Sequence, residues 1–338
     1  MNILVTGGAG YVGSVLLPEL VKDGHSIKCL DRFFFGDEFL SQKQFDGKIE
    51  LIKDDIRWFK PEILKNIDLV MDLAALSNDP VGALEPEKTY QINHLGRARV
   101  AKLSKEMGVK QYILASSASV YGQQKETVDE KSSVNPITDY SKANRKAEEE
   151  VMKLNEDNFS VTVLRFSSVY GSSPRMRFDI SVNSMILEMY RNKKIVVRGK
   201  NNSRPFIHIK DAVKAYQNII DAPKNIVSGQ IFNVGSDEQN FKMGDIAENI
   251  IKSTGQKCKL ELGDTNDHRS YITSFKKIKD AVGFIPSFSI REGTNEIYNE
   301  LCLNQLDSSN KTITLEWYKH IMSDQTLFNK LQINNQIL

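Results

Sequence analysis

The chain has 338 residues, of which 40% are hydrophobic and 26% charged, and its formal net charge is +2 at pH 7. This is the composition of an ordinary globular protein, and so small a net charge favours neither nucleic acid nor an acidic membrane as a partner. No apolar run is long enough to span a bilayer, and three widely separated cysteines, Cys29, Cys258 and Cys302, show neither metal-type nor disulfide-framework spacing. We therefore expect a protein of a reducing, cytoplasmic compartment that binds no metal.

From Asn2 to about Val169, short β-rich runs alternate with longer helical patterns. The expected strands read ILVT, SIKCL, IELI, LVMDLA, YILAS and VTVLRF, and amphipathic segments at 11–22, 87–107 and 140–155 lie between them. Repeated strand-helix order implies parallel strands joined by right-handed crossovers, and continuous apolar strands indicate burial on both faces. The pattern predicts an α/β fold, a Rossmann-type doubly wound parallel sheet.

Beyond residue 171 the rhythm becomes less regular. Helical patterns occur at 180–191, 211–221, 243–253 and 274–282, short strands near Ile195 and Ile231, and a final helix after Leu306. We interpret 1–170 as the domain that holds the sheet and 171–338 as a smaller C-terminal domain, from which some strands return to the main sheet.

A glycine-rich turn connects the first strand to the first helix. The segment ILVTGGAGYVGS places Gly7, Gly10 and Gly13 where a tight turn, a close approach of a pyrophosphate and the helix N-terminus are needed for dinucleotide binding. Asp31 follows the second strand, where a carboxylate accepts hydrogen bonds from a ribose 2'-hydroxyl and repels a 2'-phosphate, which favours NAD over NADP. Arg32 beside it weakens that preference. The alternatives are a purely structural glycine turn and a carboxylate that caps a loop.

The motifs TGGAGYVGS, DDIR, LAALS, SSASVYG and YSKAN occur in this order and are followed by RPFIHIKDAV and FNVGSDEQN. With them the sequence resembles the extended short-chain dehydrogenase/reductases, specifically the NAD-dependent nucleotide-sugar epimerase/dehydratase family of the UDP-glucose 4-epimerase type, over about residues 1–300. The resemblance implies that 1–170 binds NAD and that 171–338 mainly binds a nucleotide diphosphate sugar. It also implies a homodimer formed through the helices at 87–107 and 140–155.

Cofactor contacts are carried over where this chain has matching residues. Asp55 and Ile56 match the pair that holds the adenine, LAALS matches the segment under the dinucleotide, and Asn93 matches an asparagine that steadies the active-site strand. LAALS alone is also what any buried strand end looks like. The residues implied at the cofactor are Gly7, Gly10, Tyr11, Val12, Asp31, Arg32, Asp55, Ile56, Leu73, Ala74, Ala75, Ser77, Asn93, Tyr140 and Asn144.

The resemblance implies that Tyr140 is the acid/base group and that Ser117 hydrogen-bonds the same substrate oxygen. A tyrosine with an ordinary pKa near 10 is a poor base unless positive charge favours its phenolate, and in the family a lysine one helical turn on supplies that charge. Here that third catalytic position is Asn144, while Lys142 and Lys146 fall on other faces of the helix.

We therefore expect Tyr140 to depend on the cationic nicotinamide and the reaction to be slower or to have a more alkaline optimum. Asn144 fits a natural variant, an introduced substitution or a chain without redox turnover. If Asn144 only slows hydride transfer, we expect Asn144→Lys to raise the rate at neutral pH.

The two residues after Ser117 bear on the reaction type. Family members that eliminate water carry an Asp-Glu pair there, whereas Ala118 and Ser119 offer neither acid nor base, which disfavours a 4,6-dehydratase. A nucleotide-sugar 4-epimerase is the leading interpretation. The alternatives are a one-way C4 oxidoreductase or ketoreductase, and a non-catalytic dinucleotide-binding sensor or scaffold.

The substrate side is expected to include two arginines, because a guanidinium fork matches phosphate oxygens. The alternative for each arginine is that it forms a solvated ion pair on the surface and binds no substrate. Ser168 stands where the family commonly has asparagine. The residues implied at the nucleotide sugar are Ser117, Ser119, Ser168, Asn183, Arg204 and Arg269, with Arg175 and Arg177 as further contacts or as structural residues.

Overall fold

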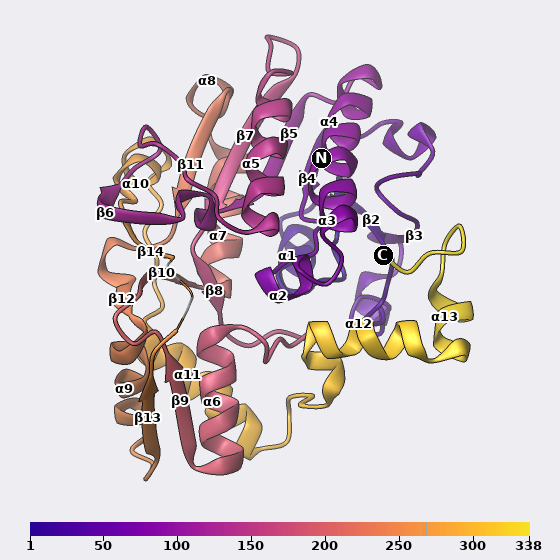
Figure 1. Ribbon diagram of the computed structural model, residues 1–338. Coiled ribbons are helices and arrows are strands. Elements are labelled where there is room, and N and C mark those ends of the chain that lie inside the picture. Colours follow the sequence, from indigo (N-terminus) through magenta and orange to yellow (C-terminus); the bar gives the residue numbers. More distant parts are fainter. Residues whose placement is uncertain (266, 268) are drawn as a thin grey trace.

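A seven-stranded parallel sheet forms the larger part of the protein, which is described by a computed structural model for residues 1–265, 267 and 269–338 (Figure 1). The strand order is β11-β7-β5-β4-β1-β2-β3, and each neighbouring pair is parallel. All six expected strands form, and a seventh from the second half of the chain joins the edge. Their bounds are β1 (Asn2–Thr6), β2 (Ser26–Asp31), β3 (Ile49–Lys53), β4 (Leu69–Asp72), β5 (Gln111–Ser117), β7 (Ser160–Phe166) and β11 (Gln230–Val234). The predicted Rossmann-type sheet is confirmed.

Both faces of the sheet are covered, as the continuous apolar strands predicted. In β1, Ile3 and Val5 pack toward one layer of helices and Leu4 toward the other. The first layer contains α1 (Gly13–Lys22), α7 (Ile209–Asp221) and α10 (Lys276–Val282). The second contains a long helical segment, α3 (Pro86–Tyr90), the π-helical turn η3 (Gln91–Gly96) and α4 (Arg97–Glu106), together with α5 (Asp139–Met152).

Local sequence explains where α5 begins. Thr138 is its N-cap, and a capping box pairs the Thr138 side chain with the Ser141 backbone and the Ser141 side chain with the Thr138 backbone. Such caps satisfy amide groups that the first turn leaves unpaired. The cap therefore fixes Tyr140 in the first turn of α5, one turn before Asn144.

A smaller group of shorter elements, most of them from the second part of the chain, lies below the sheet in Figure 1. Its helices include α6 (Ser181–Asn192), α9 (Met243–Thr254) and α11 (Ile290–Cys302), which share one apolar core. Outside the main sheet, the two parts of the chain together form the short strands β6 (Gln123–Val128), β8 (Ser168–Tyr170), β9 (Lys194–Arg198), β10 (Ser203–His208), β12 (Asn240–Lys242), β13 (Lys259–Gly263) and β14 (Ser270–Thr273). The remaining short helices are α2 (Asp79–Gly82) and α8 (Lys224–Val227), with 3₁₀ turns η1 (Lys43–Phe45), η2 (Pro61–Leu64), η4 (Ala118–Tyr121), η5 (Asp237–Gln239) and η6 (Asn310–Thr312).

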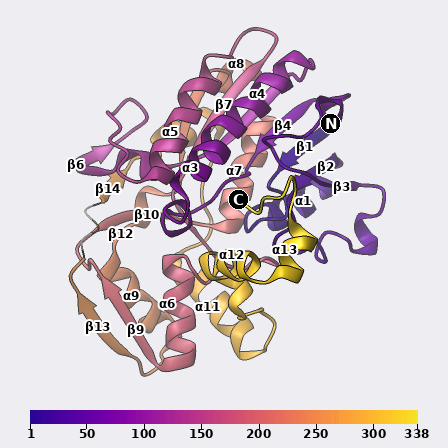
Figure 2. The same ribbon diagram turned by 45° about the vertical axis from the view of Figure 1, so that its right-hand side comes forward.

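The last residues of the chain return to the sheet domain. Helices α12 (Thr314–Ser323) and α13 (Gln325–Leu331) run beneath the sheet toward β2 and β3 in both views (Figure 2). Tyr318 and Ile321 pack with Phe34 and Val81, and Trp317 Nε1 donates to Phe34 O at 2.7 Å. The segment 171–338 therefore contributes to both parts of the molecule. It returns to the sheet domain with helices as well as with the expected strands.

Two expectations about the whole chain concern absences. Over the residues that the structure describes, no helix is both long and apolar enough to cross a membrane. Within the same residues, no group of three or more His, Cys, Asp or Glu side chains is placed to hold a metal ion.

Candidate active site

A cavity of about 550 Å³ lies where the carboxyl ends of β1, β4 and β5 face the second part of the chain. The strand order reverses between β1 and β4, which is where open parallel sheets bind ligands. The cavity wall includes Tyr140, Ser117 and Asn144 as well as the glycine turn and the expected arginines. Of the site residues expected from the sequence, all but Asn93 and Asn183 line it.

The glycine turn forms a backbone cradle at one end of the cavity. Gly7 has φ +69°, and a Cβ added there would lie 2.7 Å from the backbone of Ala74; a Cβ on Gly10 would lie 3.0 Å from Gly7 O. Only glycine satisfies a positive φ together with so close an approach. The turn and the start of α1 line the cavity, which fits the diphosphate of NAD.

The side chains of Asp31 and Arg32, next to this glycine turn, bond different partners. The carboxylate of Asp31 accepts from Ala9 N at 2.9 Å and Phe33 N at 2.8 Å, so it is fixed beside the glycine turn. Arg32 turns to Asp55, with Nη1 to Oδ2 at 2.7 Å, and Nη2 donates to Gln336 O at 2.9 Å. Because this guanidinium is already engaged, the geometry favours the ribose hydroxyl of NAD over a 2'-phosphate.

Asp55 also has a different environment from the expected one. Both of its carboxylate oxygens bind Arg57, with Nε to Oδ1 at 2.9 Å and Nη2 to Oδ2 at 2.8 Å, in addition to Arg32. Burial alone would raise the pKa of Asp55, but the two guanidinium groups lower it overall. The carboxylate of Asp55 is therefore already bonded to arginine side chains. Ile56, the other residue expected at the adenine, lines the cavity.

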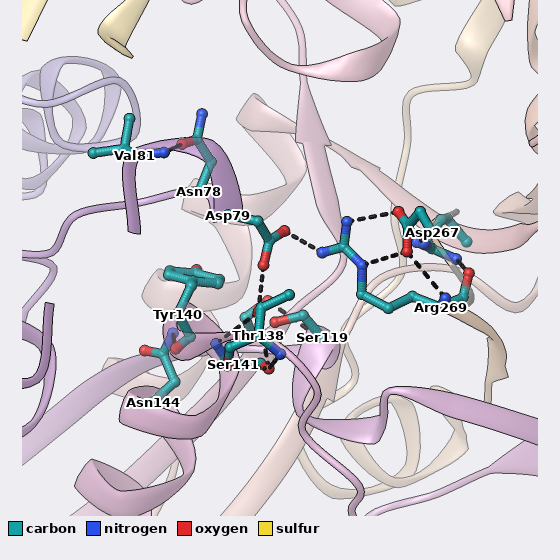
Figure 3. A network of polar contacts seen from close by, with 12 residues as sticks. Asn78, Asp79, Val81, Ser119, Thr138, Tyr140, Ser141, Asn144, Asp267 and Arg269 are labelled. Atoms are coloured by element: carbon teal, nitrogen blue, oxygen red, sulfur yellow. Dashed lines mark hydrogen bonds and ion pairs between the residues drawn. The ribbon is translucent and has the colours of Figure 1, made fainter. Parts of the chain in front are cut away.

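Tyr140 faces the cavity beside Ser117, as the sequence predicted. Figure 3 shows its ring between Asp79 and Asn144. Burial and the nearby Asp79 carboxylate raise the pKa of Tyr140, whereas a hydrogen bond with Ser117 and the charges of Arg97 and Arg177 act in the opposite direction. Ser119 N donates to Ser117 Oγ at 3.2 Å, which orients the Ser117 hydroxyl. Tyr140 and Ser117 can thus share one substrate oxygen.

Asn144 is 1% exposed and bonds a residue that sequence reasoning missed. Arg97 Nη1 donates to Asn144 Oδ1 at 2.8 Å, and Arg97 also lines the cavity. Lys142 and Lys146 are exposed, as their helical positions predicted. The sequence did hold a signal for Arg97, because it lies four residues after Asn93 and because Asp72, at the end of an apolar strand, needs a buried partner.

Two of the expected residues, Asn93 and Asn183, do not line the cavity but bond residues that do. Asn93 accepts from Leu76 N at 2.8 Å and donates to Leu76 O at 2.9 Å, so it steadies the segment after β4 as expected. Asn183 is fully buried, donates to Tyr11 Oη at 3.1 Å and to Arg177 O at 2.9 Å, and does not reach the cavity. Its expected contact with a diphosphate is wrong for this geometry, since its donors are used inside the protein.

The expected substrate arginines lie at the far end of the cavity and are paired with carboxylates. Arg269 binds Asp267 through Nε at 2.8 Å and Nη2 at 2.6 Å and bonds Asp79 through Nη1 (Figure 3). Arg204 Nη2 lies 3.3 Å from Asp267 Oδ2. A diphosphate would therefore compete with these carboxylates for the guanidinium donors, and neither Asp79 nor Asp267 was expected from the sequence.

Arg175 and Arg177 also line the cavity. Arg177 is paired with Asp179, at 2.9 and 3.0 Å, and donates to Ser77 Oγ at 3.0 Å. Arg175 forms no ion pair within the described residues, and burial together with the charge of Arg177 lowers its pKa to about 9. A buried cation in this state fits an anionic ligand such as a diphosphate. Ser168 also lines the cavity, from β8.

Known proteins resemble this chain over most of its length. A family model described as "NAD dependent epimerase/dehydratase family" matches residues 3–235. The uncharacterized UDP-glucose epimerase YtcB of Bacillus subtilis (strain 168) is 28% identical over 320 residues, which are 88% of this chain and 97% of that protein. UDP-glucuronic acid decarboxylase 1 of Danio rerio is 27% identical over 310 residues, which are 87% and 71% of the two chains. The solved structure of MoeE5 in complex with UDP-glucuronic acid and NAD matches with a TM-score of 0.79 at 25% identity, over 90% of this chain and 100% of that one.

Proposed function

This chain belongs to the NAD-dependent epimerase/dehydratase family, and on that premise we propose that it epimerises a nucleotide diphosphate sugar at C4. It is an enzyme, its cofactor is NAD, and its substrate class is the nucleotide sugars. The single observation that carries the proposal is that Tyr140 and Ser117 line one cavity with a dinucleotide cradle at one end and two arginines at the other.

We assign the residues to roles by their positions. Gly7, Gly10 and Arg175 would hold the diphosphate of NAD, and Asp31 its adenine ribose. When bound, NAD supplies hydride acceptance from a sugar carbinol carbon and hydride return. Tyr140 removes the proton of the hydroxyl group on that carbon and later gives it back, and Ser117 hydrogen-bonds the oxygen of this hydroxyl group.

Arg204 and Arg269 would bind the diphosphate of the sugar nucleotide in exchange for Asp267 and Asp79. Epimerisation, decarboxylation and one-way oxidation all begin with the same hydride transfer, so the rivals are distinguished by products. Ala118 and Ser119 are buried next to Ser117 and provide no carboxyl group for the elimination of water. A non-catalytic sensor would have no need for the paired arginines at the sugar end.

We propose a homodimer formed through the helical segment 86–106 and α5. Leu95 on this segment is 55% exposed, which supports an apolar contact there. The molar mass in solution tests this. The three cysteines are unpaired in the structure, which supports a reducing, cytoplasmic compartment.

Proton NMR of a panel of UDP-, GDP-, dTDP- and CDP-hexoses, with UDP-glucuronate included, tests the proposed reaction. After incubation with the protein and NAD, we expect one sugar to convert to its C4 epimer. Tyr140→Phe should lower this rate by about 10² or more, because the acid/base group is lost while the cavity shape stays.

Three results would contradict the proposal in different ways. Release of a nucleotide pentose from UDP-glucuronate indicates a decarboxylase, and NADH formed in proportion to substrate indicates a one-way oxidoreductase. Binding of NAD without conversion of any sugar supports the sensor.

A further inference from the structure

Tyr140 has no cation on the face of its own helix. A tyrosine that acts as a base near neutral pH needs positive charge close to its hydroxyl group. Residue 144, one turn further along α5, is an asparagine, and both neighbouring lysines are exposed. Apart from the nicotinamide ring of bound NAD, a charge that supports Tyr140 therefore has to come from another element of the protein. This inference rests on the proposed function in one respect, which is that Tyr140 is taken to be the acid/base group.

Arg97 is the buried cation that meets Asn144. It is the first residue of α4, follows the π-helical turn and is 1% exposed. Its Nη1 donates to Asn144 Oδ1 at 2.8 Å, and its Nη2 donates to Asp72 O at 3.0 Å and to Ala115 O. Asn144 Nδ2 in turn donates to Tyr140 O at 3.0 Å. The guanidinium thus has one orientation, and the Asn144 amide connects it to the first turn of α5.

The charge of Arg97 is only partly balanced by its buried counter-ion. Asp72 Oδ2 lies 3.7 Å from Arg97 Nε, and within the described residues that Nε forms no hydrogen bond. Asp72 shares its charge with two hydroxyl donors instead, Thr6 Oγ1 and Tyr112 Oη, each at 2.5 Å. We therefore describe Arg97 and Asp72 as a dipole whose positive end faces Asn144.

Among the described residues, two buried tyrosines near Arg97 add no charge. Burial raises the pKa of Tyr112 and of Tyr216, so both hydroxyl groups remain neutral. On the Tyr140 side, Asp79 is paired with Arg269, and Arg177 is paired with Asp179. Arg97 therefore differs from the other cations that influence Tyr140, because its nearest partner on that side is a neutral amide.

We propose that Arg97 is a positioning residue for Tyr140, and that, oriented by Asn144, it supplies the positive charge that residue 144 itself lacks. Asparagine is the suitable partner, because a lysine at 144 would bring a second cation within hydrogen-bond distance of Arg97. The expectation that Asn144→Lys raises the rate is therefore reversed, and that variant should be less stable and no faster.

An ionisation measurement on the full-length, NAD-loaded protein tests the proposal without any substrate. Ultraviolet difference titration of tyrosinate, with Tyr140→Phe as the reference, isolates the titration midpoint of Tyr140. Arg97→Met should raise this midpoint by about one unit, which lowers the phenolate fraction at neutral pH about tenfold. Arg97→Lys keeps the charge and should stay close to wild type. Lys142→Met removes an exposed cation from the same helix and serves as the matched control.

The double variant Arg97→Met/Asn144→Lys moves the cation from α4 to α5. It should recover the wild-type midpoint and be more stable than Asn144→Lys alone. A folded Arg97→Met with an unchanged midpoint would show that Arg97 only holds α4 to the sheet, and the proposal would be wrong. If Arg97→Met does not fold, the double variant decides, since a folded double variant with a raised midpoint overturns the proposal. Failure of wild type to convert any sugar counts against the proposed function alone.

Discussion

Helix α5 presents two residues, one turn apart, to two buried arginines, and the two pairs are built differently. Glu148 binds Arg165 in a bidentate manner, with Nε to Oε1 at 2.9 Å and Nη2 to Oε2 at 2.7 Å. Asn144 binds Arg97 through a single hydrogen bond at 2.8 Å. Glu148 is fully buried and Arg165 is 2% exposed, so both pairs lie in similarly dry surroundings.

The difference is one of charge. The Glu148 carboxylate neutralises Arg165 and also accepts from Ser116 Oγ at 2.6 Å, so this pair is a closed unit that fastens α5 to β5 and β7. The Asn144 amide orients Arg97 without neutralising it. Of these four partners, only Asn144 and Arg97 are among the described residues that line the cavity. The comparison indicates that one pair serves stability and the other serves the chemistry at Tyr140.

The largest expected effect comes from Arg165→Met. This change leaves the Glu148 carboxylate buried with only Arg145 as a cationic partner, and breaking a buried pair costs about 3 kcal/mol of unfolding free energy. Urea denaturation measures it, and the Tyr140 midpoint should not move. Lys146→Met, on the exposed face of α5, is the control and should change stability by less than about 0.5 kcal/mol. A shifted Tyr140 midpoint in Arg165→Met would show that the Glu148–Arg165 pair also affects the chemistry at Tyr140, and the proposed difference between the two pairs would be wrong.

Glu148→Gln makes the Glu148–Arg165 pair resemble the Asn144–Arg97 pair. The Arg165 cation then faces an amide, and loss of a charged, hydrogen-bonded partner should cost about 2 kcal/mol. The urea midpoint should fall while NAD binding and the pH profile of the reaction stay as in wild type. An unchanged urea midpoint would mean that the carboxylate contributes nothing beyond what an amide provides.

Asn144→Asp makes the Asn144–Arg97 pair resemble the Glu148–Arg165 pair, and it should spare the fold but harm the reaction. Burial and Asp79 raise the pKa of Tyr140, and its deprotonated form is the base, so the wild-type rate should rise with pH through the neutral range. A carboxylate at 144 neutralises Arg97 and repels the phenolate. The rise should therefore move up by about one pH unit, which is about a tenfold lower rate at a given neutral pH. Initial rates across pH measure this shift, and an unshifted profile would contradict the role of Arg97.

The smallest effect is expected for Arg145→Met. Arg145 is partly exposed and bonds Glu148 at 3.1 Å and Glu149 at 3.0 Å. Because exposed pairs are screened by water, its loss should cost about 0.5 kcal/mol by urea denaturation. A loss as large as that of Arg165→Met would show that Glu148 depends on both arginines rather than on the buried one.

Features that depend on neighbouring residues were readable from the sequence. Apolar runs and helical periodicity predicted the six strands and the helices of the sheet domain, and the spacing of Gly7, Gly10 and Asp31 predicted the dinucleotide cradle. The positions of Tyr140, Asn144, Lys142 and Lys146 followed from helix geometry alone. The predicted sheet is confirmed, and the glycine turn and helix positions are found where the sequence placed them, because these features need only local backbone geometry.

Predictions about where a polar side chain points were less secure. Arg32 was implied at the cofactor but bonds Asp55, and Asn183 was implied at the nucleotide sugar but bonds Tyr11. Arg204 and Arg269 are in place, although each is already paired with Asp267. A long polar side chain has several rotamers within reach of different partners, and burial selects among them only after the chain is folded.

The sequence by itself determined the parallel sheet, the cradle and the tyrosine at the start of α5, because strand, turn and helix signals act over a few residues. Only the tertiary structure decided what supports that tyrosine. Arg97 and Asn144 are 47 residues apart, and Arg32 and the Gln336 carbonyl are 304 apart. No local pattern links such residues. They meet because packing of α4, α5 and the C-terminal helices on the sheet leaves each buried charge with few available partners.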